Sequence, residues 1–490
     1  MDIINVLFLA SEADPLVKVG GLGDVAGSLP HALQVLPESK SKGYHIDIRV
    51  VLPFHGAIRK KVPDPEFLFE FNVSAQKGSV KAQAYHTLVN EVPVYLIAGA
   101  PIGEDALVYS TDAAEDGDKY IFFSKAVLPF VKKLGWQPDI LHANDWHTAI
   151  AVYQLKFEKQ IDPFFKNTRS ILTVHNLPFM GSGTETAMEA YGVAPSRYSR
   201  VPWWGRKFPL PLGLQAADRI TTVSQTYAKE ILTPEYGCGL EKLLQARHRV
   251  VSGIVNGLDE DCWDPSDDAK IHVNFDSSSL HKRKENKTAI INEFKLNPDP
   301  DLPLLVLISR MDQQKGVDLA VEGLSRGVGR KWQAILLGMG NPQLEEACRQ
   351  LEESYPDRVR AVICFDTALS RRMYAGGDIL LMPSRYEPCG LAQMMAMRYG
   401  CVPLARATGG LQDTILDVSQ HPKEGTGFLF RPATVSAFTK TLNRALDYFA
   451  DQNLWREMQL RGMQQNFSWE NSALHYLDLY LDVLGRKASQ

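Results

Sequence analysis

The sequence predicts an α/β fold made of two doubly wound domains. The first observation is length, because 490 residues are too many for one ordinary hydrophobic core. The second is that short apolar runs alternate with helical patterns from end to end, as in parallel sheets covered by helices on both faces. The third is that the alternation comes in two series, separated by a stretch rich in turn residues.

The first series supplies one predicted parallel sheet. Its strands are expected at residues 3–10, 46–52, 92–98, 140–143, 170–174 and 219–223. Residues 117–134 and 146–157 follow helical patterns. Residues 66–88 show strand-like alternation with no helix between, which predicts an antiparallel insertion.

The second series supplies another parallel sheet. Its strands are expected at residues 304–309, 334–338, 359–364, 379–383 and 402–405, and the helices between them at residues 317–324, 342–354 and 391–399. The join lies between residues 250 and 270, where Asn256-Gly257 and Asp264-Pro265 are turn signals. Three helical patterns close the chain, with Phe467-Ser468-Trp469 separating the last two. We therefore expect domains at residues 1–255 and 256–467, followed by a final helix within 468–490.

Composition excludes several classes of protein. Hydrophobic residues make up 45% and charged residues 22%, which is typical of a soluble globular chain. The net charge of −4 argues against a nucleic-acid partner, and no apolar run reaches the roughly 18 residues of a membrane helix. The six cysteines form no CxxC pair, which indicates a reducing compartment without a disulfide framework or a metal site.

The N-terminus does not resemble a secretion signal. Met1 to Asn5 contain no basic stretch ahead of an apolar one, so residues 3–10 are interpreted as a buried strand. We expect a cytoplasmic protein that does not enter the membrane.

A glycine-rich loop, Lys18-Val19-Gly20-Gly21-Leu22-Gly23-Asp24, follows the first predicted strand and opens a helix. Gly20 and Gly21 allow the backbone to approach a ligand closely, and a helix N-terminus offers amides to an anion. Lys18 adds a positive charge and Asp24 a carboxylate. The alternative is a tight strand-to-helix turn with no ligand, and a glycine pattern alone does not decide between them.

Two further polar clusters follow later strands of the first domain. Asn144 and Asp145 come after the strand at 140–143, and His175 and Asn176 after the strand at 170–174. The first pair has the alternative role of capping the next helix, and a lone histidine is more often structural than catalytic. Three such clusters at successive strand ends favour a ligand site, since ligands of open α/β sheets bind beyond the carboxyl ends of the strands.

The second domain contributes positive charge. Arg310 follows the strand at 304–309 and Lys315 comes five residues later. An arginine makes bidentate contacts and a lysine supplies a point charge, which together suit a diphosphate. The alternative is two solvated surface charges. Gly338 and the Thr408-Gly409-Gly410 segment follow later strands as close-approach turns, and the latter is expected to present amides to a phosphate.

One acid lies between a strand and a helix of the second domain. Glu387 belongs to the segment Ser384-Arg385-Tyr386-Glu387-Pro388-Cys389-Gly390-Leu391, where it is placed to bind sugar hydroxyls. Gly390 and Leu391 would bring amides at the helix N-terminus. The alternative for Glu387 is an ordinary first-turn acid that complements the helix dipole.

Taken together, these segments closely resemble the family of bacterial glycogen synthases and plant starch synthases over nearly the whole chain. The matching stretches are Lys18 to Leu22 (Lys-x-Gly-Gly-Leu), residues 221–228 and 233–237, Ser309-Arg310 with Gln314-Lys315-Gly316, and residues 387–391, 408–411 and 467–469. Each stretch alone is weak, but the ordered set is highly specific.

The resemblance implies a GT-B fold, that is, two Rossmann-like domains with an interdomain cleft and a last helix that crosses back to the first domain. The first domain would be the acceptor side and the second the nucleotide-sugar side. The implied reaction transfers glucose from ADP-glucose, with UDP-glucose as the alternative donor, to the non-reducing end of an α-1,4-glucan, with retention of configuration. The acceptor would be a maltooligosaccharide, glycogen or starch, and no cofactor is implied.

The resemblance also assigns roles, and it implies as catalytic residues Lys18, His175, Arg310, Lys315 and Glu387. Arg310 and Lys315 would bind the donor diphosphate, with Lys18 closing over it. The other residues implied on the donor side are Gly20, Gly21, Asp145, His175, Asn176, Asn256, Gly338, Phe365 (against the base), Glu387, Cys389, Gly390, Leu391, Thr408, Gly409 and Gly410. The acceptor-side residues are Tyr109 and Asp24, and the alternative role of Asp24 is to support the loop.

Two departures from related patterns matter. Related retaining transferases carry a second acid eight residues after the first, where this chain has Met395 as expected of this family. Gly23 precedes Asp24 where many bacterial members have alanine, which resembles plant-type and granule-bound synthases. A bacterial or cyanobacterial cytoplasm is expected, with starch-granule association and a plastid as the alternatives.

Three other functions stay open at this point. One is a retaining glucosyltransferase with a small acceptor. Another is a catalytically silent glucan-binding protein, which would be expected to have a damaged donor site. The third is a phosphorylase, which would need a lysine-bound pyridoxal cofactor.

Overall fold

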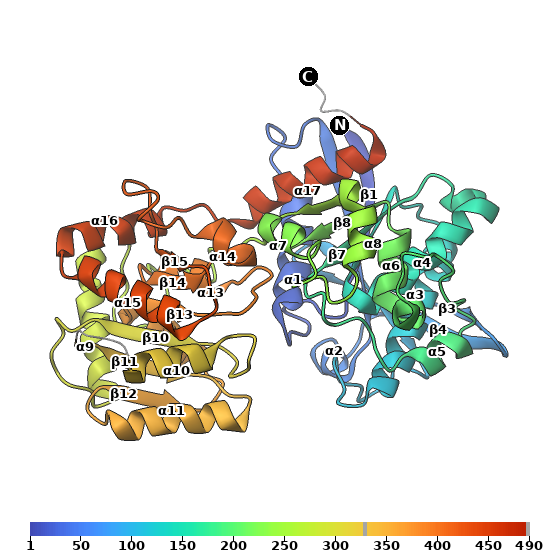
Figure 1. Cartoon of the computed structure of the whole chain (residues 1–490). Coiled ribbons are helices and arrows are strands. Elements are labelled where there is room, and N and C mark those ends of the chain that lie inside the picture. The colour runs from blue at the N-terminus through green and yellow to red at the C-terminus, as the bar shows by residue number, and fades with distance from the viewer. Residues whose placement is uncertain (327–330, 487–490) are drawn as a thin grey trace. The chain divides into compact units, whose positions relative to one another are not determined.

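The computed structural model describes residues 1–326 and 331–486, and it divides into two compact units. The first unit contains Met1–Gly257 together with Trp469–Gln490, and the second contains Leu258–Ser468. Both are layered α/β units in which helices cover a central sheet (Figure 1). No helix within the described residues is long and apolar enough to cross a membrane.

The sheet of the first unit has nine strands. They are β1 (Asp2–Leu9), β2 (Tyr44–Pro53), β3 (Glu66–Ala75), β4 (Gly78–Val89), β5 (Val92–Gly99), β6 (Ile140–Asn144), β7 (Arg169–Val174), β8 (Arg219–Thr222) and β9 (Val251–Gly253). The spatial order is β3-β4-β5-β2-β1-β6-β7-β8-β9. The seven strands from β5 to β9 are parallel, whereas β3, β4 and β5 pair antiparallel. The predicted antiparallel insertion is therefore confirmed.

Alternate side chains of these strands pack into two hydrophobic cores, one on each face of the sheet. Leu7 and Leu9 of β1 face one core, which they share with α3 (Ala113–Leu134), α4 (Asp145–Ile161) and α6 (Pro209–Ala216). Val6 and Phe8 face the other core, which they share with α1 (Gly21–Gln34) and α17 (Trp469–Leu484). This alternation follows from the two-residue period of a strand and gives the unbroken apolar runs of the sequence. The helices of the unit are α1 (Gly21–Gln34), α2 (Gly56–Lys61), α3 (Ala113–Leu134), α4 (Asp145–Ile161), α5 (Glu185–Ala190), α6 (Pro209–Ala216), α7 (Gln225–Glu230), α8 (Glu241–Ala246) and α17 (Trp469–Leu484).

The ends of α3 show how local sequence sets an element. The side chain of Asp112 accepts a hydrogen bond from the amide of Ala114, and Glu115 and Asp116 lie in the first turn. Gly135 ends the helix in the left-handed region at φ 72°. Acids at the start and a glycine just past the end are the usual signals that satisfy the terminal amide and carbonyl groups.

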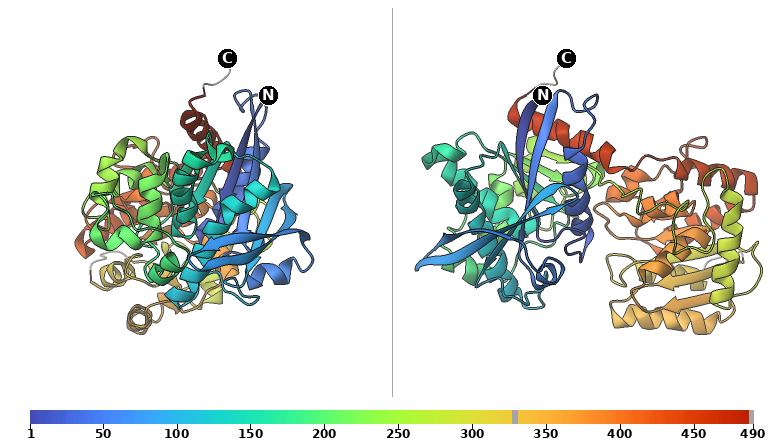
Figure 2. Two further views of the ribbon diagram at one scale, coloured as in Figure 1. Left: turned by 90° about the vertical axis from the view of Figure 1, so that its right-hand side faces the viewer. Right: turned by 180° about the vertical axis from the view of Figure 1, so that it is seen from behind.

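The C-terminal helix α17 belongs to the first unit although 211 residues of the second precede it. Its buried residues include Trp469, Tyr476 and Tyr480, and the Tyr480 hydroxyl lies 2.8 Å from Nδ1 of His142 on β6. Figure 2 shows this helix, in red, beside the blue strands of the first unit. The expectation that the last helix returns to the first domain is confirmed.

The second unit has a six-stranded, fully parallel sheet. Its strands are β10 (Leu304–Ile308), β11 (Gln333–Leu337), β12 (Val359–Val362), β13 (Ile379–Met382), β14 (Val402–Arg406) and β15 (Phe428–Phe430). The spatial order is β12-β11-β10-β13-β14-β15. Numbered within the unit, this is the 3-2-1-4-5-6 order of a Rossmann fold. The predicted fold class is thus confirmed.

Helices cover both faces of this second sheet. They are α9 (Arg283–Glu293), α10 (Val317–Arg326), α11 (Pro342–Ser354), α12 (Thr367–Gly376), α13 (Ala392–Arg398), α14 (Gly409–Thr414), α15 (Val435–Phe449) and α16 (Gln452–Met463). One core joins the sheet to α10, α11, α15 and α16, and the other joins it to α9, α12 and α13.

Both sheets reverse their strand order at one point. In the first unit the reversal lies between β1 and β6, and in the second between β10 and β13. In open α/β sheets, ligands bind beyond the carboxyl ends of the strands at such a reversal. The polar clusters noted in the sequence follow β1, β6 and β7 in one unit and β10 and β13 in the other.

Candidate functional site

The loop after β1 is organised around Glu12, a residue that sequence reasoning did not select. Its side chain is buried, and its carboxylate accepts hydrogen bonds from the amides of Val19 and Gly20. Burial raises the pKa of Glu12, and these amide bonds counteract part of that effect. The Gly20 amide was expected to meet a ligand anion, but it donates to the protein's own carboxylate.

Tyr109 also holds this carboxylate. Its hydroxyl donates to Oε1 of Glu12 over 2.9 Å and lies 3.0 Å from Oγ of Ser11. Burial, with the nearby Glu12 charge, raises the pKa of Tyr109 well above its ordinary value. The phenol predicted to face an acceptor thus has its hydroxyl engaged inside the chain, where it supports the loop.

Lys18 and Asp24 form an ion pair across the loop. Lys18 is partly exposed, whereas an added Cβ at Gly23 would lie 3.0 Å from its side chain and 3.2 Å from Glu12. An added Cβ at Gly21 would meet no protein atom within 4 Å. Gly23 is therefore needed for packing of the loop, whereas Gly21 presents its bare backbone to open space.

Asp145 begins α4 but does not cap it. It adopts a left-handed backbone with φ 55° and is buried, and its carboxylate accepts from the amide of His175 over 2.8 Å and from that of Asn176. Burial raises its pKa to about 7, and the two amide bonds offset part of that rise. Asn144, at the N-cap position, also makes no side-chain capping bond. The helix-capping alternative is wrong for both residues.

His175 is bound to the same network. Its Nε2 lies 2.8 Å from Oδ1 of Asn144, whose Nδ2 donates to the carbonyl of Leu9 over 2.8 Å. Because that amide oxygen can only accept, Nε2 carries the proton and Nδ1 is an acceptor. Burial lowers the pKa of His175 to about 3, so the ring is neutral at physiological pH. The ends of β1, β6 and β7 are thus linked by one chain of hydrogen bonds.

Two predicted residues of the first unit have unpartnered buried atoms. Oδ1 of Asn176 and Oδ1 of Asn256 are buried and have no hydrogen-bond donor in the described structure. Such atoms are rare in native interiors and call for a partner. Both side chains retain acceptor capacity.

In the second unit, Lys315 and Glu387 come together at the point where the sheet reverses. Nζ of Lys315 lies 2.9 and 2.7 Å from the two carboxylate oxygens of Glu387, and Oγ of Ser384 donates to the same carboxylate over 2.9 Å. Glu387 is buried, and 19% of the Lys315 side chain is exposed. Glu387 is therefore more than a first-turn acid complementing a helix dipole.

Glycine at position 316 makes this approach feasible. Gly316 has φ 66°, and an added Cβ would lie 2.1 Å from the carbonyl oxygen of Pro383, at the end of β13. Only a residue without a side chain permits the loop after β10 to lie this close to the next loop. Backbone contact between Arg385 and Gln314, at 2.7 Å, ties the two loops together.

Arg310 contacts other side chains of the loop after β10. Its side chain is 64% exposed, with Nη1 3.1 Å from Asp312 and Nη2 3.4 Å from Gln314. The structure therefore places the two predicted cations on one loop but holds only Lys315 against Glu387.

The remaining predicted donor-side residues line the neighbouring loops. Phe365, after β12, is 83% exposed, whereas Cys389 is buried. An added Cβ at Gly338 would lie 1.9 Å from the carbonyl oxygen of Ser309, so this glycine serves backbone packing. Gly390 has φ 71° and precedes Leu391 and α13.

The Thr408-Gly409-Gly410 segment packs on the Glu387 loop. The Gly410 amide donates to the carbonyls of Glu387 and Pro388 over 3.1 and 3.2 Å. An added Cβ at Gly409 would lie 2.0 Å from the Glu387 carbonyl. The expectation that this segment presents its amides to a phosphate is thus wrong for Gly410, because a backbone carbonyl occupies that amide.

Sequence reasoning missed Glu12 and Ser384. Glu12 lies two residues beyond the buried run of the first strand, and Ser384 lies three residues before Glu387. Their position after a strand was the available signal, but their roles depend on which amide or carboxylate folds against them. Within residues 1–326 and 331–486, no three His, Cys, Asp or Glu side chains gather to hold a metal ion.

Comparisons with known proteins agree with this architecture. The model of the starch synthase catalytic domain matches residues 5–246, and that of glycosyl transferases group 1 matches residues 302–448. Sucrose-phosphate synthase from Thermosynechococcus elongatus shares the fold, with a TM-score of 0.59 at 21% identity over 98% of this chain and 99% of that one.

Nearer relatives match along the full length. Glycogen synthase from Geotalea daltonii is 38% identical, covering 99% of this chain and all of the relative, and glycogen synthase from Clostridium perfringens is 38% identical over 98% and 99%. The catalytic domain of starch synthase IV from Arabidopsis thaliana, solved with ADP and acarbose, superposes with a TM-score of 0.86 at 30% identity, over 99% of this chain and 100% of that one. With its two Rossmann-like units and these full-length matches, the chain belongs to the glycogen synthase and starch synthase family of GT-B glycosyltransferases.

Proposed function

We propose that this glucosyltransferase takes glucose from ADP-glucose and adds it to the non-reducing end of an α-1,4-glucan, with retention of the α-configuration. The observation that carries the proposal is the Lys315–Glu387–Ser384 cluster at the reversal point of the second sheet. A cation, a carboxylate and a hydroxyl held together there suit a ligand that is a phosphate at one end and a sugar at the other.

In this assignment the second unit binds the donor. Lys315 and Arg310 bind the diphosphate and stabilise the negative charge that develops on it as the glycosidic bond breaks. Glu387 accepts hydrogen bonds from the glucose hydroxyls, and its pairing with Lys315 keeps both groups in position before the donor arrives. Phe365 stacks on the base, since an exposed aromatic ring at a strand end suits a flat heterocycle. The other donor-side residues are Gly338, Cys389, Gly390, Leu391, Thr408, Gly409 and Gly410.

The first unit supplies neutral groups for the sugars. Nδ1 of His175 accepts a hydrogen bond from a glucose hydroxyl, while Asn176 and Asn256 offer their unpartnered carbonyl oxygens. Gly21 lets the backbone approach the donor closely, beside Gly20 and Lys18. Asp145 acts through the amides of His175 and Asn176, and Asp24 and Tyr109 support the glycine-rich loop.

A direct same-face transfer suits these side chains better than a covalent glycosyl intermediate. A double-displacement mechanism needs a free carboxylate as nucleophile. Asp145 is engaged by two amides, and Glu387 is engaged by Lys315 and Ser384. The cations hold the leaving diphosphate. The diphosphate guides the acceptor hydroxyl to the same face of the glucose from which the diphosphate departs.

The test is incorporation of radiolabelled glucose from ADP-glucose and, separately, from UDP-glucose. Acceptors are maltohexaose, glycogen, starch granules, and the small acceptors glucose and fructose 6-phosphate. We expect transfer from ADP-glucose to the glucans, with products that β-amylase digests and whose new anomeric proton has the α coupling. Label found only in small acceptors, or in no acceptor, would contradict the proposal, and the granule arm shows whether the enzyme works on solid starch.

A further inference from the structure

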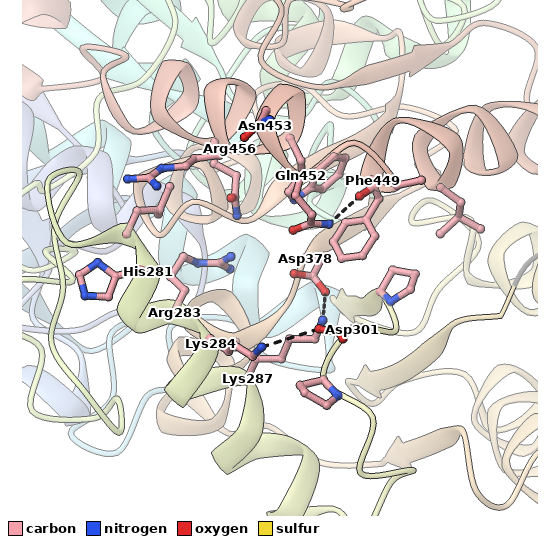
Figure 3. Close-up of a pocket in the computed structure, with 18 of the residues that line it drawn as sticks. His281, Arg283, Lys284, Lys287, Asp301, Asp378, Phe449, Gln452, Asn453 and Arg456 are labelled. Atoms are coloured by element: carbon pink, nitrogen blue, oxygen red, sulfur yellow. Dashed lines mark hydrogen bonds and ion pairs between the residues drawn. The ribbon is translucent and has the colours of Figure 1, made fainter.

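A cavity of about 940 Å³ lies in the second unit (Figure 3). It lies at the opposite ends of the strands from Lys315 and Glu387. Its lining includes Pro303, just before β10, and Asp378, just before β13. Helix α9, the end of α15 and the start of α16 complete the wall. A five-residue strand such as β10 spans roughly 16 Å, so this cavity is separate from the donor-side cluster.

Positive charge dominates the lining. Five lysines and arginines line the cavity against two carboxylates, Asp301 and Asp378. We call the cavity the basic pocket, after those five cations: Arg283, Lys284, Lys287, Lys331 and Arg456. This excess is local, because the whole chain carries a net charge of −4. A cavity with cations in excess concentrates anions.

Not all of this charge is neutralised by the chain itself. Lys287 and Asp378 form a buried ion pair at 2.7 Å, and Lys284 lies 3.7 Å from Asp301 at the surface. Lys331 and Arg456 are exposed, and neither has an ion-pair partner in the described part of the chain. Two cations of the basic pocket are therefore available to an incoming anion.

Arg283 adds a buried guanidinium. It is only 6% exposed, and its Nη2 donates to the carbonyls of Tyr374 and Gly377, whereas its Nε is a buried donor with no partner among the described residues. In Figure 3 its guanidinium extends toward Asp378, into the space between α9 and α16. A buried arginine with unused donor capacity is a recurrent feature of sites that bind oxyanions.

The pocket is larger than a bare ion requires. Phe449 and Trp455 give it an apolar wall, and Nε1 of Trp455 is a second buried donor without a partner in the described structure. Asn453 brings an exposed amide to the rim. Binding sites for small organic ligands combine such apolar surface with a few polar groups, in volumes of roughly 300–1,000 Å³.

We propose that the basic pocket binds a small phosphorylated ligand at a second site, with the phosphate between Arg456, Lys331 and the Arg283 side and any organic part against Phe449 and Trp455. A doubly charged phosphate matches the surplus of cations. A neutral glucan would gain little from that charge, and a nucleic acid would need a basic surface far wider than one pocket. The ligand is either free phosphate or a phosphate ester.

The experiment measures binding to the full-length protein by calorimetry, with mannose 6-phosphate, mannose and inorganic phosphate as probes. The double variant Lys331→Gln/Arg456→Gln removes the two unpaired, exposed cations, and Lys440→Gln removes an exposed lysine of α15 that does not line the pocket. We expect mannose 6-phosphate to bind the double variant at least tenfold more weakly than the wild-type protein, and Lys440→Gln to bind like wild type. Equal Tm values for the three proteins show that the fold is kept.

Each other result decides the matter. If mannose 6-phosphate binds the wild-type protein and the double variant with equal affinity, the proposed site is wrong. It is also wrong if neither mannose 6-phosphate nor inorganic phosphate binds. Mannose binding as tightly as its phosphate overturns the anion assignment. Inorganic phosphate could bind as tightly as mannose 6-phosphate, with the binding of both weakened in the double variant. In that case the site is confirmed and its ligand is free phosphate.

Discussion

The two polar clusters at the strand ends differ in how they carry charge. In the first unit, the Glu12 and Asp145 carboxylates are held by backbone amides, and His175 is a neutral ring. In the second unit, a lysine is paired with Glu387 and an arginine is largely exposed. The carboxylates of the first cluster are thus held by backbone amides, whereas the second cluster is held by an ion pair and carries one further, largely exposed cation. In the proposed function, the same position in the same kind of sheet serves recognition of neutral hydroxyls in one unit and of phosphate in the other.

The largest effect is expected from Lys315→Ala. It removes the charge nearest the proposed diphosphate and leaves Glu387 buried without its cation. We expect kcat for glucan elongation to fall by about 10²–10³, or roughly 3–4 kcal/mol, the typical loss for one charge-stabilising donor. Initial rates with labelled ADP-glucose measure it. Lys440→Ala is the matched control, and a Lys315→Ala enzyme as fast as that control would refute the phosphate assignment.

Asp145 should make the first unit sensitive to pH. Its pKa in the fold is about 7 against an ordinary 3.8, so the stabilisation it contributes is present below pH 4 and is lost as pH rises towards 7. Asp145→Asn removes this dependence. Urea unfolding from pH 4.5 to 7.5 should show the variant gaining on the order of 3 kcal/mol relative to wild type. A difference that stays constant with pH would mean that Asp145 titrates normally in the fold.

Glu12→Gln tests the amide network with little change of shape. The one oxygen of a glutamine can still accept from Val19 and Gly20, but without a charge it holds these amides less strongly, and the glutamine nitrogen cannot accept from the Tyr109 hydroxyl. The anchor of the glycine-rich loop is therefore weakened. We expect kcat/KM for the donor to fall about tenfold, close to 1.4 kcal/mol. The steady-state measurement is paired with a Tm to exclude unfolding. Unchanged kinetics would show that Glu12 does not position this loop for transfer.

The smallest effect is expected from two glycine substitutions, which distinguish a glycine needed for close approach of a ligand from a glycine needed for packing. An added Cβ at Gly21 meets nothing within 4 Å, whereas one at Gly410 would lie 1.9 Å from the carbonyl oxygen of Cys389. Gly21→Ala should leave Tm unchanged and raise the donor KM a few-fold, whereas Gly410→Ala should lower Tm by several degrees. Thermal melts and donor titrations distinguish the two. If Gly21→Ala left the donor KM unchanged, the proposed close approach of the donor there would be wrong.

Much of the architecture follows from local sequence. Unbroken apolar runs predicted eleven parallel strands at nearly their observed bounds, and alternation at residues 66–88 predicted the antiparallel insertion. The strands β9 and β15 were missed because three residues are too few to form a recognisable run. The spatial order of the strands also lay beyond local reasoning, because pairing partners are far apart in the chain.

The residues of the candidate site were easier to predict from the sequence than the contacts between them. The residues of the clusters could be predicted because they follow strands. The partner of each charged or polar group could not, because it depends on how distant segments of the chain pack together. The Gly20 amide was expected to meet a ligand and meets Glu12, and the Gly410 amide meets the backbone of Glu387 and Pro388. Gly316 and Gly338 likewise admit a neighbouring backbone.

The difference between the two clusters is tested most directly by ADP binding. ADP is titrated by calorimetry into the wild-type protein, Lys315→Ala and His175→Ala. The titrations compare the loss of ADP affinity when a charged group is removed with the loss when a neutral group is removed. We predict that ADP affinity falls more than tenfold in Lys315→Ala and stays within about twofold of wild type in His175→Ala, since ADP carries phosphates and no transferable glucose. The reverse order, or an equal loss in both variants, would contradict the division of phosphate and sugar recognition between the two units.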